Sequence, residues 1–184
     1  MKVKCTIVAQ DWDGLIPSLL AGKFDVIMAS MFITDKRLEV MDFTQPYAVD
    51  PASFAVAKDS ELGKMGMTQE KVSLNDETSA KAAIDKLKPL LKGKTIGTQA
   101  ATLIQKFVET YFSNEVEIRS YKTTEQHDLD LLAGRVDGLF AQQTALAATL
   151  AKPEYANYTI AGPGFAGGLF GLGTGAGLRK EDTQ

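Results

Sequence analysis

Arg37 is the residue whose type and position most directly suggest chemistry. It follows an apolar run at residues 24–29 that is short, β-branched in its middle and typical of a buried strand. The Thr34-Asp35 pair then predicts a helix start, because a Thr oxygen can accept a hydrogen bond from an exposed backbone N–H. A helix start favours an anion, and a guanidinium donates two parallel hydrogen bonds to a carboxylate. Arg37 is therefore a candidate carboxylate-binding residue, or alternatively a surface side chain paired with Asp35 or Glu39.

Two other reactive residue types each occur once. Cys5 is the only cysteine and His127 the only histidine, so neither an intrachain disulfide, a zinc cluster nor a Cys-x-x-Cys redox motif can be built. Cys5 lies in an alternating run and is interpreted as a small core residue. His127 falls at the surface-leaning start of a predicted helix and is interpreted as solvated. We predict no metal site and no cofactor.

The elements that would position Arg37 alternate between strand and helix. The first block has strands at residues 3–10 and 24–30 and helices at 11–23 and 34–41, followed by a strand at 52–59. The second block has helices at 79–91, 102–112, 123–135 and 144–151 and strands at 94–99, 116–121 and 136–142. Such alternation indicates βαβ units with helices packed on a parallel sheet.

Two less regular segments connect these blocks. Residues 60–77 show no clear periodicity and are interpreted as a mobile surface loop. The glycine-rich segment from residue 158 onwards lacks the spacing of a phosphate-binding loop, so we interpret it as a linker and a strand that returns to the first block. We predict a partial first lobe at 1–54, a second lobe at 55–162 and a return segment at 163–184, with a ligand cleft between the lobes.

Composition excludes several classes of partner. The formal net charge of −3 gives no basic surface for nucleic acid. No apolar run approaches the roughly 18 to 20 residues that span a bilayer, so no direct membrane insertion is expected. The sequence also starts without a charged-then-apolar signal segment.

Four segments taken in order carry a family resemblance: residues 11–47, 94–99, 121–141 and 173–182. They resemble the polar amino-acid solute-binding proteins of ABC transporters, most of all the group that takes lysine, arginine, ornithine or opines. The block from Ile33 to Tyr47 is the most specific part. The resemblance implies an α/β, periplasmic-binding-protein-like II fold, with two doubly wound lobes that are joined by a hinge and close on a ligand. It also implies an ABC permease as partner.

The resemblance also implies roles for individual residues. Arg37 would hold the α-carboxylate of the ligand, with Ser30 and Met31 on the turn before it. Trp12 would stack on the ligand side chain, since Trp offers the best face for a cation; alternatively, it is a core aromatic. The second lobe would contribute Gln99, Thr102 and Gln142.

Departures from the family pattern alter the expected pocket. Gln142 stands where most amino-acid binders have an aspartate for the α-ammonium, and a neutral amide can only hydrogen-bond. Phe32, Leu103 and Ile104 replace polar residues, which predicts a more apolar pocket.

The chain also starts at what would be the second strand of the first lobe and stops where relatives continue. We therefore expect an incomplete first lobe, truncated at both ends, and a homodimer that covers it, perhaps by exchange of elements. The expected location is the periplasm, or the cytoplasm if the gene lacks a signal peptide.

Three functions compete on this sequence. The first is a solute-binding protein without catalysis. The second is a truncated remnant that binds no ligand or serves as a self-associating interaction module, which Gln142 and the Leu103-Ile104 pair favour. The third is an enzyme resembling cyclohexadienyl dehydratases, which needs a positioned acid or base that the cleft candidates lack.

Overall fold

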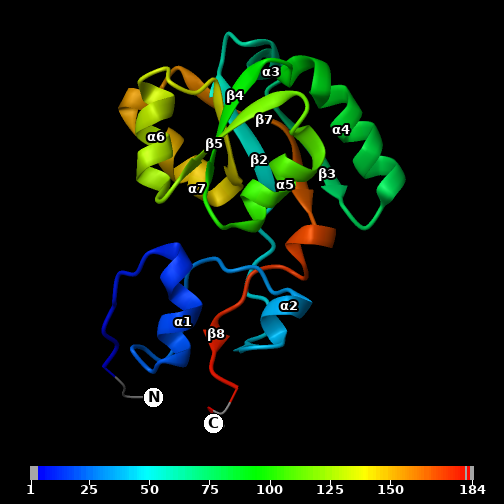
Figure 1. Ribbon diagram of the computed structural model, residues 1–184. Coiled ribbons are helices and arrows are strands. Elements are labelled where there is room, and N and C mark those ends of the chain that lie inside the picture. Colours follow the sequence, from blue (N-terminus) through cyan, green and yellow to red (C-terminus); the bar gives the residue numbers. More distant parts are fainter. Residues whose placement is uncertain (1–3, 181, 183–184) are drawn as a thin grey trace.

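The computed structural model describes residues 4–180 and 182 and contains two bodies of unequal size (Figure 1). Residues 52–170 form the large body, and residues 4–43 with 177–180 form the small body. Two crossing segments, residues 44–51 and 171–176, join them. Val3 of the strand predicted at 3–10 lies outside the described residues, as do parts of the return segment.

The large body is built on a six-stranded mixed sheet. Its strands lie in the order β3-β7-β2-β6-β4-β5, in which β4 is parallel to β5 and β6 while β2 is antiparallel to β6 and β7. The bounds are β2 (Ala52–Ala57), β3 (Met67–Ser73), β4 (Lys94–Gln99), β5 (Val116–Tyr121), β6 (Gly138–Gln142) and β7 (Tyr158–Ala166).

Helices cover both faces of this sheet (Figure 1). Phe54 and Phe140 face a core shared with α4 and α5, while their neighbours Ala55 and Leu139 face a second core shared with α6 and α7. A sheet buried on both faces needs apolar residues at successive positions, which explains the uninterrupted apolar runs. The bounds are α3 (Glu61–Met65), α4 (Glu77–Leu91), α5 (Leu103–Phe112), α6 (Thr124–Leu132), α7 (Gln143–Leu150), η2 (Pro153–Tyr155) and η3 (Gly168–Phe170).

The small body has short elements around a separate core. They are η1 (Trp12–Gly14), α1 (Leu15–Leu20), α2 (Asp35–Leu38), and the antiparallel pair of β1 (Asp42–Phe43) and β8 (Gly177–Leu178). The core holds five buried side chains: Leu15, Leu19, Ile27, Met31 and Met41. The predicted helix around residues 11–23 is thus confirmed in its position.

Two predicted strands of the small body are wrong. The run at 24–30 makes only one isolated bridge, from Ile27 to Gly177, and Met28 is 69% exposed. Residues 4–10 form no regular element, and Cys5 is exposed rather than buried. A strand exists only where a neighbour pairs with it along its length, and a local apolar pattern does not supply that neighbour.

The predicted mobile loop at 60–77 is also wrong. Ser60 starts α3, where its side chain accepts a hydrogen bond from Gly63 N at 3.0 Å, and β3 pairs in parallel with β7. Because β3 is an edge strand, its sequence lacks the periodicity of a strand buried on both faces.

The two crossing segments are hydrogen-bonded to each other. Tyr47 N donates to Thr174 O at 3.0 Å, and Thr174 N donates to Ala48 O at 2.8 Å. Asp50, at the end of the first segment, accepts a hydrogen bond of 3.2 Å from Thr144 N at the start of α7. The bodies are therefore joined by a paired two-stranded connection that is anchored on the large body.

We expect Gly171→Ala to destabilise the protein more than Gly22→Ala. Both glycines have a positive φ, 68° and 71°. A Cβ at Gly171 would lie 1.8 Å from the Ile33 carbonyl oxygen, whereas one at Gly22 would meet nothing within 4 Å. Conformational strain alone costs about 1 kcal/mol at each position, and the clash adds to it at Gly171. Urea unfolding of both variants measures the difference, and equal losses would contradict the close approach.

Candidate functional site

The candidate site lies between the two bodies, at the carboxyl edge of the large sheet. Gln99 and Gln142 are the last residues of the parallel strands β4 and β6, and such strand ends are where ligands of α/β proteins bind. Thr102 caps α5 beside them. The small body contributes Trp12 from η1 and Arg37 from α2.

Arg37 is held without a carboxylate partner among the described residues. Thr34 caps α2 as predicted, accepting from Arg37 N at 3.4 Å. The guanidinium Nη1 donates to Phe32 O at 2.8 Å, and its carbon lies 5.7 Å from the centre of the Trp12 ring. Burial lowers the pKa of the guanidinium. The alternative in which Arg37 forms a surface ion pair with Asp35 or Glu39 is not what the structure shows.

Two strained residues connect the bodies across the cleft. Among the described non-glycine residues, only Ser30 and Ala101 have a positive φ, 48° and 58°. The Ser30 carbonyl accepts from Gln142 Nε2, and the Ala101 carbonyl accepts from Trp12 Nε1, both at 3.3 Å. Unusual backbone conformations of this kind gather at functional sites. The turn that carries Ser30 and the loop that carries Ala101 therefore meet the facing body directly.

The remaining predicted site residues differ in their accessibility. Gln99 Nε2 donates to Lys122 O at 3.3 Å, and Thr102 uses its hydroxyl within its own cap, donating to Gln99 O at 2.7 Å. Met31 is 1% exposed in the core of the small body. The structure thus brings Trp12, Ser30, Arg37, Gln99, Thr102 and Gln142 to the cleft but not the Met31 side chain.

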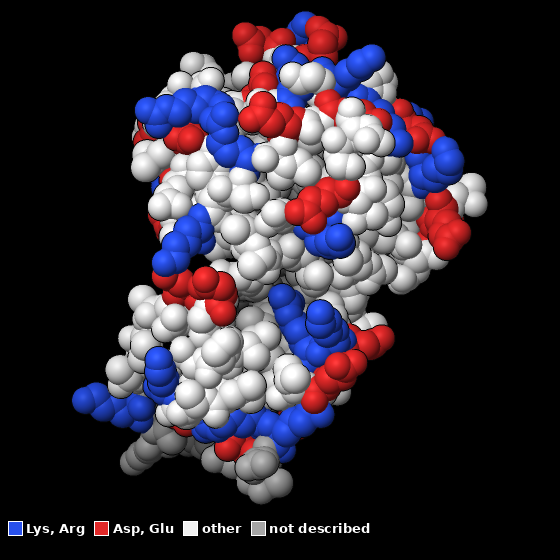
Figure 2. Space-filling model, viewed as in Figure 1, with Lys and Arg blue, Asp and Glu red and all other residues white. Residues whose placement is uncertain are grey.

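Two adjoining cavities occupy the space between the bodies, where the space-filling view shows a hollow (Figure 2). The larger is an open hollow of about 430 Å³ and the smaller a cavity of about 50 Å³. Trp12, Gln99 and Thr124 line both. The smaller is also lined by Phe32, Leu103 and Ile104, three residues from which a more apolar pocket was predicted.

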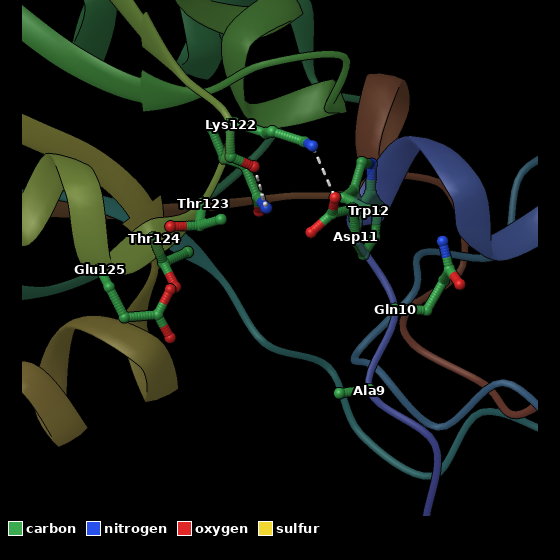
Figure 3. A pocket seen from close by; sticks show the side chains of 9 residues that line it. Ala9, Gln10, Asp11, Trp12, Lys122, Thr123, Thr124 and Glu125 are labelled. Carbon is green, nitrogen blue, oxygen red and sulfur yellow. Dashed lines mark hydrogen bonds and ion pairs between the residues drawn. The ribbon is translucent and has the colours of Figure 1, made fainter.

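An ion pair bridges the two bodies over the larger hollow. Lys122 Nζ lies 2.6 Å from Asp11 Oδ2, and Figure 3 shows the Lys122 side chain reaching toward Asp11. The hydrogen bond and charge of Asp11 raise the pKa of the Lys122 ammonium. The Lys122–Asp11 pair is thus a third contact between the bodies, besides the hydrogen bonds of Trp12 to Ala101 and of Gln142 to Ser30.

His127 is a cleft residue that the sequence interpretation missed. It is 2% exposed and lines the smaller cavity, so the prediction of a solvated histidine is wrong. It packs near Gly97 on β4, where a Cβ would lie 3.5 Å from His127 Cβ, an ordinary contact distance. No local pattern in the sequence signals this burial.

The described part of the chain contains neither a membrane-spanning helix nor a group of metal-binding side chains. None of its helices combines the length and the apolar character needed to cross a bilayer. The described residues also contain no group of three or more His, Cys, Asp or Glu placed to hold a metal ion.

Comparison with known proteins gives a consistent assignment. The model of the bacterial extracellular solute-binding proteins, family 3, matches residues 1–184. The octopine-binding periplasmic protein of Rhizobium meliloti is 48% identical over 99% of this chain, and the histidine-binding periplasmic protein of Salmonella typhimurium is 34% identical over all of it. The chain spans 62% and 64% of the lengths of these two relatives.

Solved structures agree with this assignment. An ancestral arginine-binding protein bound to arginine superposes with a TM-score of 0.75 at 25% identity, covering 98% of this chain and 69% of that one. The holo arginine-binding protein ArgBP of T. maritima gives 0.70 at 27% identity, covering 99% and 68%. The predicted α/β periplasmic-binding-protein fold is confirmed.

We expect Lys122→Gln to loosen the contact between the bodies, with Trp12 fluorescence as the readout. Trp12 is the only tryptophan and contacts the facing body, so separation should shift its emission to the red. Because the pKa of Lys122 is raised, the pair is intact below the ordinary lysine value of about 10.4 and is lost as pH rises through the raised pKa.

The variant should thus show the red-shifted emission at neutral pH and lack the alkaline transition of the wild type. Lys94→Gln is the control, since it removes an ion pair with Asp137 inside the large body. Identical emission of Lys122→Gln and wild type across the pH range would contradict a role of the pair in closing the cleft.

Proposed function

The chain belongs to family 3 of the bacterial extracellular solute-binding proteins, and from this premise we propose that it binds a polar or cationic amino acid or an opine between its two bodies. The relatives are solute-binding proteins and not enzymes. The observation that carries the proposal is Arg37, a partly buried guanidinium at the cleft with no carboxylate partner in the described residues.

Arg37 is suited to the carboxylate of the ligand. Its Nη1 is held by the Phe32 carbonyl, which fixes the plane of the guanidinium and leaves other N–H donors for a charge-assisted contact. Ser30 lies at the strained turn before α2 and can donate from its hydroxyl or backbone N–H to the same carboxylate. Lysine could not replace Arg37 equally, because an ammonium lacks the planar, two-pronged donor geometry.

We propose that Trp12 binds the rest of the ligand. Its ring lines both cavities and lies beside the Arg37 guanidinium, so a ligand anchored on Arg37 passes along the ring. A cationic side chain gains from the negative face of the indole. Gln99, Thr102 and Gln142 complete the wall on the large body.

Binding requires the bodies to move. The smaller cavity, about 50 Å³, is far below the roughly 300–1,000 Å³ of pockets that hold a whole small-molecule ligand. The contacts of Trp12 with Ala101 and of Gln142 with Ser30 close it off. We propose that the paired crossing segments act as the hinge and that a ligand enters when these contacts open.

Gln142 favours a ligand whose α-nitrogen is not a simple ammonium. The smaller cavity has no Asp or Glu among its lining residues, so a primary ammonium there would meet only neutral acceptors. In an opine the α-nitrogen carries a second carboxylate-bearing substituent. The octopine-binding relative, at 48% identity, supports this choice over an unmodified amino acid.

The cellular setting is proposed from the relatives. Several are named periplasmic, which supports a periplasmic location and delivery of the ligand to an ABC permease. The predicted homodimer stays a prediction; Ile7, Met28 and Val49, which are 97%, 69% and 67% exposed, are apolar side chains that such an interface would cover. Sedimentation velocity over a concentration series tests it.

A ligand screen tests the proposed function. We expect octopine or a cationic L-amino acid to raise the melting midpoint, because a ligand at 100 times its Kd stabilises the folded state by about 2.7 kcal/mol, or roughly 5–10 °C for a chain of this size. Arg37→Ala should abolish the shift. Arg37→Lys should weaken binding about 10- to 100-fold by calorimetry, since it retains the charge but loses the paired hydrogen bonds.

Arg135→Lys is the matched control, because Arg135 pairs with Asp130 on the large body and lies outside both cavities. It should bind like the wild type. If no ligand shifts the midpoint of a cooperatively folded sample, this chain does not bind, and the interpretation as a non-binding remnant is preferred.

A further inference from the structure

The imidazole of His127 is buried without a hydrogen bond. Three buried side-chain atoms in the described residues lack a hydrogen-bond partner, Thr98 Oγ1 and both ring nitrogens of His127. Leaving a buried polar atom unsatisfied is costly, so each such group calls for an explanation. Thr98 does not line either cavity, whereas His127 lines the smaller one. The unsatisfied nitrogens therefore belong to the wall of the candidate site.

The residues around His127 pack against its ring but make no hydrogen bond with either ring nitrogen. Tyr121 packs edge-on, with 6.1 Å between the ring centres. Asp128 Oδ1 lies 3.0 Å from Nδ1, outside hydrogen-bonding geometry, and its Oδ2 accepts from Thr149 Oγ1 at 2.7 Å. Asp128 is thus tied to α7, and Nε2 has no group of the protein to bind.

The other polar side chains of the smaller cavity are largely engaged. Gln99 donates to Lys122, Thr102 to Gln99, and Gln142 to the Ser30 carbonyl. No Asp or Glu lines this cavity, and the Asp128 carboxylate beside it approaches the His127 ring at Nδ1, at 3.0 Å. His127 Nε2 is buried without a partner, so it has a donor position available to an acceptor of the ligand.

Arg37 does not line the cavity itself, but it contacts two of its lining residues from the small body. Phe32, whose carbonyl accepts from Arg37, and Trp12, whose ring lies 5.7 Å from its guanidinium carbon, both line the cavity. His127 lines it from α6 on the large body. A ligand between the bodies could therefore present one carboxylate to Arg37 and a second to His127.

The smaller cavity has room for one functional group of a ligand but not for the whole molecule. About 50 Å³ suits a carboxylate, and the adjoining hollow of about 430 Å³ can take the remainder past Trp12. We propose that His127 is a specificity-determining residue, whose Nε2–H donates a hydrogen bond to a second ligand carboxylate and so selects dicarboxylic ligands over simple amino acids. This inference rests on the proposed function, and it assigns to His127 the preference for dicarboxylic ligands over simple amino acids.

The selectivity of binding distinguishes this role from a structural one. Octopine is arginine with a 1-carboxyethyl group on its α-nitrogen, so octopine carries a second carboxylate that arginine lacks. Calorimetry should show that wild type prefers octopine and that His127→Phe lowers the ratio of the two affinities about 10- to 100-fold. Arginine affinity should change less than about threefold, and His127→Gln, whose amide N–H can replace Nε2–H, should retain most of the preference.

Leu131→Val is the control on the same helix, since Leu131 is 1% exposed and packs in the core beyond the cavity. It should leave the ratio unchanged while lowering the melting midpoint. A merely structural His127 would behave like Leu131.

A measurement on the wild type avoids any effect of substitution on folding. Because His127 is the only histidine, its ring-nitrogen NMR signals need no assignment by mutation. Octopine should shift the Nε2 signal strongly and arginine should not.

An unchanged affinity ratio in folded His127→Phe, or equal Nε2 shifts with both ligands, would overturn the role of His127 while leaving amino-acid binding intact. If wild type binds neither ligand, the proposed function fails as well.

Discussion

The pairing of the two crossing segments is the constraint on which the rest of the structure depends. The hydrogen bonds between Thr174 and Ala48 hold residues 44–51 and 171–176 side by side, so the small body is joined to the large one through one paired connection. Asp50 fixes the first segment to the start of α7. Because β2 and β7, which adjoin these segments, are central strands of the six-stranded sheet, the position of the cleft follows from the sheet itself.

Both walls of the cleft carry local conformations that a stability-optimised chain would avoid. Ser30 and Ala101 hold a positive φ without being glycine, and His127 is buried with unsatisfied nitrogens. Each costs free energy that the apolar cores on the two faces of the sheet offset. The three lie where the bodies face each other, which is the distribution expected when strain serves binding rather than folding.

The charges of the site are arranged asymmetrically. His127 lines the smaller cavity, and Arg37 contacts its lining residues Phe32 and Trp12, while Asp11, Glu125 and Lys122 line the larger hollow, where Lys122 pairs with Asp11. Gln142, a neutral residue, also lines the smaller cavity. These positions are the grounds on which we propose an arginine derivative with two carboxylates as the ligand.

The sequence by itself determined the helices and central strands of the large body, because their apolar periodicity is local, and it located Arg37 through the Thr34 cap. It did not determine that residues 24–30 form no strand, that β3 pairs with β7 or that Cys5 is exposed, since each depends on which distant segment lies alongside. His127 shows the same limit: its burial at the cleft depends on how α6 packs on β4. Local patterns specify the elements, whereas burial and pairing depend on contacts between residues far apart in the chain.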